Sequence, residues 1–255
     1  MFTQTQKYDK IILKGNGYMK RVVSLVRKAI DEYGMIREGE RVAVGVSGGK
    51  DSMVLLAALA MLSKYHPANF EVVGISVDPG FGGDFSDVAR YAEEIGVEYH
   101  VKKTQLKEII FDERKEQSPC SLCSKMRRGA LNDMAKEYGC DTLALGHHMD
   151  DVLETFFLSL LYEGRVNCFS PFTYLDRSRV TQIRPMIYVR ECDVKSAVKR
   201  ADIPVMPKVC PVDGKTKRED MKHIIRDLEE KTAPGLKKRL FHAVASSGIE
   251  GWREF

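Results

Sequence analysis

The pattern of apolar positions predicts helices and strands in alternation from about residue 18 onward. Apolar residues recur at helical spacing over 18–34, and Gly34 is a typical C-terminal end for such a helix. A β-branched run at 41–47 then passes through two glycines into an apolar segment at 53–65. This part of the chain therefore predicts a buried strand, a tight turn and a buried helix.

The same alternation continues for about another hundred residues. Strands that alternate with helices indicate an α/β fold with a mainly parallel sheet and helices on both faces. Ligands of such sheets bind beyond the carboxyl ends of the strands. Further strands are expected at 71–78, 97–103 and 141–147, and further helices at 85–96, 125–139 and 149–164.

The C-terminal third departs from this regular pattern. Residues 171–179 have the composition of a loop or hairpin, and residues 190–204 predict a helix stopped by Pro204. The tail from residue 217 is mostly helical, with a break near Pro234 and Gly235. We therefore expect helical additions at both ends of the α/β fold. The expected division is an N-terminal helical segment (1–39), an α/β domain (40–205) and a C-terminal segment with one cysteine and helices (206–255).

Composition places the chain among soluble globular proteins. Of its 255 residues, 44% are hydrophobic and 30% are charged, which leaves disordered and fibrous classes without support. No apolar run approaches the length of a membrane span, and the N-terminus lacks the apolar core of a secretory signal, so we expect a cytoplasmic protein without a membrane partner.

Net charge is a weak guide to the partner. A formal charge of +4 does not by itself indicate a nucleic acid, and local runs of basic residues are usually solvated helix faces. Such runs nevertheless mark the places where a polyanion could bind. They are Lys125, Arg127 and Arg128; Lys195, Lys199 and Arg200; Lys215, Lys217 and Arg218; and Lys237, Lys238 and Arg239.

A glycine-rich segment between the first strand and its helix has the features of an anion site. Its glycines let backbone N–H groups approach an anion, its serines add donors, and the helix N-terminus adds a positive dipole end. The spacing differs from the Walker A pattern of kinases and GTPases. The segment consists of Ser47, Gly48, Gly49, Lys50, Asp51 and Ser52.

A second polar cluster follows the strand predicted at 141–147. The run LGHHMDDVLET brings Gly146, His147, His148, Asp150, Asp151 and Glu154 to a strand end and the first turn of a helix. Acids are favoured in a first helical turn by the dipole alone, but Asp150 and Asp151 are also suitable oxygen ligands for magnesium. Asp78, which ends another strand, is either a turn residue or a contact to a nucleotide.

Two of the six cysteines form a CxxC pair, Cys120 and Cys123. This spacing suits zinc, an iron-sulfur cluster or dithiol redox chemistry. A third ligand is needed, and Cys210, in a loop between two prolines, and Cys168, in an irregular stretch, are both open at this point. A zinc site would need a fourth ligand that the sequence does not indicate. We interpret Cys140 and Cys192 as ordinary thiols.

The SGGKDS segment resembles the signature of the PP-loop ATP pyrophosphatases, which cleave ATP to AMP and pyrophosphate while adenylating a carbonyl oxygen. LGHHMDDVLET resembles the second motif of that family. The resemblance implies that Ser47, Gly48, Gly49 and Ser52 hold pyrophosphate and that Lys50 neutralises its charge. It also implies that Asp51 helps to place magnesium or substrate, with Asp78, Gly146, His147, Asp150 and Asp151 near the nucleotide.

The chain resembles the TtcA-like tRNA 2-thiocytidine synthetases over roughly residues 18–230. The features that carry this resemblance are the segments PCSLCSKMRRG, LALGHHMDD and RPMIYVRECD and the isolated Cys210. The resemblance implies a 4Fe-4S cluster on Cys120, Cys123 and Cys210, with one iron open to sulfide. Family members often carry a cysteine where this chain has Asp213, and the C-terminal part is short. Relatives that thiolate a T-loop uridine carry zinc-binding cysteine pairs at both ends, which this chain lacks, and this favours the cytidine branch.

The expected activity is therefore ATP-dependent thiolation of a tRNA pyrimidine at C2, with cytidine 32 of the anticodon loop as the favoured target. The expected catalytic residues are Lys50, Asp51, Asp151 and the three cysteines. Mg²⁺ is expected to accompany ATP. Cysteine desulfurase or inorganic sulfide would supply sulfur, and the active unit could be a homodimer. Alternatives are sulfur transfer to another tRNA base, a small molecule or a carrier protein, and a non-catalytic cluster sensor. The expected RNA-binding residues are Arg127, Arg128, Arg184, Lys217 and Arg218.

Overall fold

A six-stranded sheet organises the computed structural model, which describes residues 17–114, 119–207, 209–210 and 217–252. Its strand order is β3-β2-β1-β4-β6-β5, and every pairing is parallel except that of β5 with β6. The strands are β1 (Arg41–Gly45), β2 (Glu71–Asp78), β3 (Glu98–Lys103), β4 (Thr142–Ala144), β5 (Phe172–Leu175) and β6 (Val180–Ile183). Asp213 and Lys215 lie outside the described residues.

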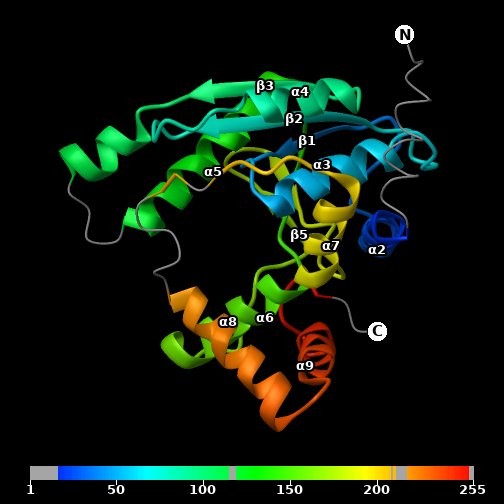
Figure 1. Ribbon diagram of the computed structural model, residues 1–255, viewed down its shortest axis with the longest axis vertical. Coiled ribbons are helices and arrows are strands. Elements are labelled where there is room, and N and C mark those ends of the chain that lie inside the picture. Colours follow the sequence, from blue (N-terminus) through cyan, green and yellow to red (C-terminus); the bar gives the residue numbers. More distant parts are fainter. Residues whose placement is uncertain (1–16, 115–118, 208, 211–216, 253–255) are drawn as a thin grey trace.

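Helices cover both faces of the sheet (Figure 1). Val42 and Val44 of β1 join the apolar core beneath α2, α3, α4 and α7, whereas Ala43 joins the core beneath η1 and α5. This alternation follows from the twofold side-chain period of a strand. The helices are α2 (Tyr18–Tyr33), α3 (Lys50–Leu62), α4 (Ser86–Glu94), α5 (Pro119–Glu137), α7 (Glu191–Ala201) and the π-helical segment η1 (Glu108–Glu113).

A second group of helices lies below the sheet in Figure 1, where α8 and α9 both pack on α6. The break predicted near Pro234 and Gly235 separates α8 with its π-helical extension from α9. This group consists of α6 (Met149–Leu158), η2 (Ser159–Glu163), α8 (Lys217–Asp227), η3 (Leu228–Thr232) and α9 (Leu236–Ala245).

The predicted fold class is confirmed, and residues 171–179 form part of the β5–β6 hairpin. Two helices begin earlier than their apolar patterns predict: α3 begins at Lys50, and α5 begins at Pro119. The CxxC pair therefore lies within the first two turns of α5 instead of before the helix. The division at residues 39 and 205 stays a prediction. No helix in the described ranges is both long and apolar enough to cross a membrane.

Candidate functional site

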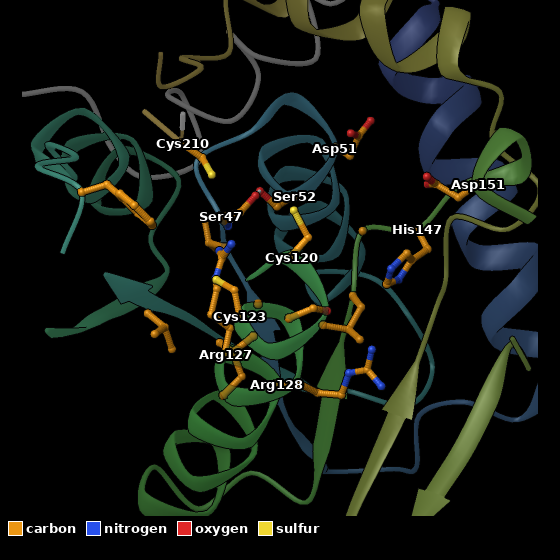
Figure 2. A pocket seen from close by; sticks show the side chains of 18 of the residues that line it. Ser47, Asp51, Ser52, Cys120, Cys123, Arg127, Arg128, His147, Asp151 and Cys210 are labelled. Carbon is orange, nitrogen blue, oxygen red and sulfur yellow. Dashed lines mark hydrogen bonds between the residues drawn. The ribbon is translucent and has the colours of Figure 1, made fainter. Parts of the chain in front are cut away.

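A cavity of about 530 Å³ opens where the strands β1, β2 and β4 end. Figure 2 shows the side chains that line it, with the cysteines beside the serines of the glycine-rich loop and with Asp51, His147 and Asp151 on the other side. Polar lining residues are Ser47, Asp51, Ser52, Cys120, Cys123, Ser124, Arg127, Arg128, His147, Asp151 and Cys210. Segments far apart in the sequence thus meet at one edge of the sheet.

The serine side chains of the glycine-rich loop accept hydrogen bonds from its backbone. The Ser47 N–H donates to Oγ of Ser52 at 3.1 Å, and the Gly49 N–H donates to Oγ of Ser47 at 3.3 Å. Gly48 has φ +78°, and a Cβ built on it would overlap the sulfur of Met206. A Cβ on Gly146 would lie 3.0 Å from the backbone nitrogen of Ser52. Glycine at both positions therefore permits the close packing that shapes this loop.

Lys50 is held at the start of α3 by two carboxylates. Its Nζ lies 2.8 Å from Asp51 and 3.3 Å from Glu191, and these ion pairs raise its pKa although burial alone would lower it. Burial alone would also raise the pKa of Glu191, but its contacts with Lys222, Lys195 and Lys50 lower it to about 2. Glu191 lies in the RPMIYVRECD segment, but sequence reasoning gave this residue no role.

His148 joins the two cavity carboxylates, a role that the sequence did not reveal. The Asp151 N–H donates to Nδ1 of His148 at 3.3 Å, and the His148 N–H donates to the Asp151 carboxylate at 2.9 Å, which forms a capping box at the start of α6. Its Nε2 lies 3.4 Å from Asp51. Asp51 and Asp151 are thereby fixed around the same cavity.

Asp150 faces away from this pair. One carboxylate oxygen accepts from the Glu191 N–H at 2.7 Å, and the other accepts from Nζ of Lys237 at 2.7 Å. Asp78 instead forms a local turn, in which its side chain accepts from the Gly80 N–H at 2.9 Å. In this arrangement Asp150 ties α6 to α7 and α9, and Asp78 has the turn role that the sequence left open. The expected contacts of both residues with magnesium or nucleotide stay predictions.

Glu154 is a buried carboxyl on α6, 6% exposed. Burial, followed by the charge of Asp151, raises its pKa to about 7, although Arg218 and Lys222 act in the opposite sense. Between the ordinary glutamate pKa of 4.5 and about 7, the folded protein holds this proton more firmly than the unfolded chain. This protonated carboxyl therefore contributes to the free energy of unfolding, in full below pH 4.5, and the contribution is lost as the pH rises through 7.

We therefore expect Glu154→Gln to gain stability relative to the wild type as the pH rises from 5 to 8, by about 1–3 kcal/mol. Urea unfolding of both proteins across this range measures the difference. Asp220→Asn, a change at an exposed carboxyl of α8, is the control and should show no such trend. Parallel stability curves for Glu154→Gln and the wild type would contradict the assignment.

His147 lines the cavity as a neutral imidazole. Burial, with a further contribution from Arg184, lowers its pKa to about 4. Its Nδ1 is buried and has no hydrogen-bond partner in the described part of the chain, and its ring lies 5.1 Å from that of Phe169. The neutral ring therefore adds no charge to this side of the cavity.

The three cysteines Cys120, Cys123 and Cys210 line the same cavity, and Figure 2 shows their side chains around one space beside Ser47 and Ser52. Burial and the other two thiols raise the pKa of Cys123, and Arg127 acts against this. Within the described ranges, no three His, Cys, Asp or Glu side chains gather closely enough for a single metal ion. A 4Fe-4S cluster is larger than one ion, and three soft thiolates facing one cavity fit it.

The expected RNA-binding residues separate into three groups. Arg127 and Arg128 line the cavity. On α8, Arg218 lies 3.4 Å from Asp151 and Lys217 lies 4.2 Å from the ring centre of Tyr162. These two residues are exposed or half-buried next to the site.

Arg184 is different, because it is only 7% exposed. Its guanidinium donates to the Ser170 carbonyl at 2.6 Å and packs 5.0 Å from the ring centre of Phe169. Burial, followed by the charge of Arg128, lowers its pKa to about 10. In this structure Arg184 therefore packs against Phe169 and the backbone of Ser170. Its contact with RNA stays a prediction.

A parallel sheet with an SGGKDS loop at a helix N-terminus defines a nucleotide-binding protein of the PP-loop class, and the family model of the PP-loop domain matches residues 19–224. The tRNA-cytidine(32) 2-sulfurtransferase of Geotalea daltonii is 40% identical over 231 residues, which cover 89% of this chain and 91% of that protein. Its counterpart from Citrifermentans bemidjiense is 39% identical over 230 residues, covering 89% and 90%. The chain therefore belongs to the PP-loop family, in the group of the tRNA-cytidine(32) 2-sulfurtransferases.

Solved structures agree with this placement. The U34-tRNA thiolase NcsA from Methanococcus maripaludis, determined with its 4Fe-4S cluster, superposes with a TM-score of 0.74 at 27% identity, covering 93% of this chain and 81% of that chain. The NH3-dependent NAD synthetase from Campylobacter jejuni has a TM-score of 0.50 at 13% identity, covering 89% of this chain and 91% of that one, and shares the fold.

Proposed function

We propose that this chain uses ATP to thiolate cytidine 32 in the anticodon loop of tRNA, with a 4Fe-4S cluster on Cys120, Cys123 and Cys210. The observation that carries the proposal is that the glycine-rich loop and the three thiols line one cavity. Thiolation requires an activated oxygen and a sulfur atom to meet, so the nucleotide and the thiols must share a space. The names of the relatives from Geotalea and Citrifermentans support the choice of cytidine 32.

The reaction would proceed in two steps. First, the C2 carbonyl oxygen of the pyrimidine attacks the α-phosphorus of ATP, and pyrophosphate leaves. Hydrosulfide then adds to C2, and AMP departs with the former carbonyl oxygen, which leaves a C=S bond and releases one proton. Donors of the loop at 47–52, together with the dipole of α3, would stabilise the charge on the departing pyrophosphate.

Charged residues at the cavity would place the other reactants. Asp51 and Asp151, which His148 fixes around the cavity, would bind Mg²⁺ together with phosphate oxygens and water. Lys50 would leave its carboxylate partners to neutralise pyrophosphate. Cys120, Cys123 and Cys210 would hold a 4Fe-4S cluster, which with only three protein ligands would supply a soft site for sulfide.

The RNA would approach through the arginine side of the cavity. Arg127 and Arg128 line it and are suited to phosphates next to the target base. A base in a single-stranded loop can be unstacked into a pocket at modest cost, which makes an anticodon-loop cytidine a suitable substrate. Cysteine desulfurase or inorganic sulfide would supply the sulfur, and the tRNA substrate places the reaction in the cytoplasm.

Nucleoside mass spectrometry of total tRNA provides the test. We expect 2-thiocytidine to disappear in a strain that lacks this protein and to return when the wild-type chain is expressed again. Purified, anaerobically reconstituted protein should release pyrophosphate and form 2-thiocytidine on a tRNA transcript with cytidine at position 32, and should not thiolate a transcript with uridine there. Unchanged 2-thiocytidine in the deletion strain would refute the proposal, as would the absence of tRNA-dependent pyrophosphate release.

A further inference from the structure

Two phenylalanines form an apolar wall of the cavity that no step above uses. Phe81 lies in the loop after β2, and Phe111 lies in η1, and both line the cavity. Their ring centres are 5.6 Å apart with an interplanar angle of 81°, which is an edge-to-face pair. Both side chains are half-buried, so ring surface stays accessible to a ligand.

The loop that carries Phe81 is fixed against the segment that leads to Cys210. A Cβ built on Gly83 would lie 3.3 Å from Cε of Met206 and 3.9 Å from Cγ2 of Val209. At its other end, the loop is held by the turn that Asp78 caps. The loop of Phe81 therefore packs against the segment that leads to Cys210, and both residues line the cavity.

Phe111 is placed near the other two cysteines. It packs on the same apolar cluster as Leu122 and Cys123, and η1 contacts α5. The aromatic pair thus adjoins both cysteine-bearing segments. Val77, near the end of β2, extends the apolar surface of this wall and also lines the cavity.

The order of the strands separates this wall from the acidic side of the site. β1 carries the glycine-rich loop and lies between β2, which leads to Phe81, and β4, which leads to His147 and Asp151. A phosphate or a metal ion is favoured on the side of the donors and the carboxylates. An apolar wall with two aromatic rings is suited to the face of a flat heterocycle instead.

We propose that Phe81 and Phe111 form the stacking surface that holds the target pyrimidine with its C2 atom beside the thiols. This inference rests on the proposed tRNA thiolation. The base that receives sulfur has to lie next to the cysteines, whereas the adenine of ATP needs only to be within reach of the glycine-rich loop. Stacking on aromatic rings tolerates any base, so this wall orients the pyrimidine, and other contacts select it.

Leucine substitutions test this surface, because leucine keeps the apolar volume and removes the aromatic face. We expect Phe81→Leu and Phe111→Leu each to raise the KM for tRNA by about 5- to 100-fold, the range that corresponds to loss of one base–aromatic stack. The Kd for ATP and the iron content should stay unchanged. Phe111→Tyr, which restores a ring, should return the KM for tRNA close to the wild-type value.

Phe157→Leu is the matched control. Phe157 also forms an edge-to-face pair, with Phe156 at 6.2 Å and 75°, and it lies outside the described lining of the cavity. We expect this change to leave the KM for tRNA unaltered. Equal effects of Phe157→Leu and Phe111→Leu on that KM would mean that loss of packing, and not loss of stacking, is measured, and would refute the inference.

Three other outcomes would also overturn it. A raised Kd for ATP with an unchanged KM for tRNA would assign the wall to adenine. A loss of iron or faster bleaching of the cluster in air, with both affinities unchanged, would show that the rings only shield the cluster. If the wild-type protein is active and the leucine variants have an unchanged KM for tRNA, the stacking surface is refuted while the proposed function stands. A wild-type protein that does not thiolate tRNA would refute the proposed function itself.

Discussion

Cys210→Ser is expected to reduce tRNA thiolation by about a hundredfold or more, because loss of a metal ligand should exceed the 10- to 100-fold effects typical of groups that only support a ligand. Serine has nearly the same shape as cysteine but lacks the soft thiolate that iron binds. The cavity and its glycine-rich loop should stay intact. Binding of ATP, measured by calorimetry, should therefore be unchanged, while the iron content and the visible absorption of the cluster fall.

Cys192→Ser is the matched control for this change. Cys192 is an exposed thiol near the start of α7, and it lies outside the described lining of the cavity. We expect this variant to keep its iron and its activity. If Cys210→Ser retained both the cluster and thiolation, the third ligand would have to be sought elsewhere. If Cys192→Ser lost them, thiol oxidation or misfolding would explain the effect better than ligation.

Gly48→Ala is expected to weaken ATP binding by about 10- to 100-fold, the equivalent of one lost hydrogen bond to a charged group. The new methyl group would overlap the sulfur of Met206, and φ at this position is +78°, which alanine rarely adopts. Because the Met206 N–H also donates to the Gly48 carbonyl at 2.9 Å, the loop and the segment before Cys210 must move together. Donors of the loop then lose their alignment with the phosphates.

Two further variants separate the overlap from the backbone strain. Gly39→Ala places a methyl group at a φ of +70° with nothing within 4 Å, so it should cost about 1–2 kcal/mol of stability and leave the Kd for ATP unchanged. In the double variant Gly48→Ala with Met206→Ala, the side-chain overlap is removed, and ATP binding should partly recover. Calorimetric Kd values for Gly48→Ala equal to those of Gly39→Ala would show that the overlap with Met206 is unimportant.

Local patterns in the sequence were sufficient for the fold and for part of the site. The alternation of short apolar strands with apolar helices predicted the parallel sheet. Each element can be recognised locally, because the spacing of its apolar residues repeats within a few positions. The position of SGGKDS between a strand and a helix predicted a loop that leads directly into a helix, and α3 begins within it at Lys50. The anion site itself stays a prediction. The helix starts at Lys50 and Pro119 were missed, because polar first turns lack an apolar period.

Tertiary structure decided which polar residues belong to the cavity. Asp150 and Asp151 are neighbours in sequence, but successive helical positions point about 100° apart, so one binds Glu191 and Lys237 while the other faces the cavity. Whether an arginine such as Arg184 is exposed depends on chain that packs over it from elsewhere. Cys210 lies beside Cys123 only because the fold brings together segments 87 residues apart, and no local period records such a contact.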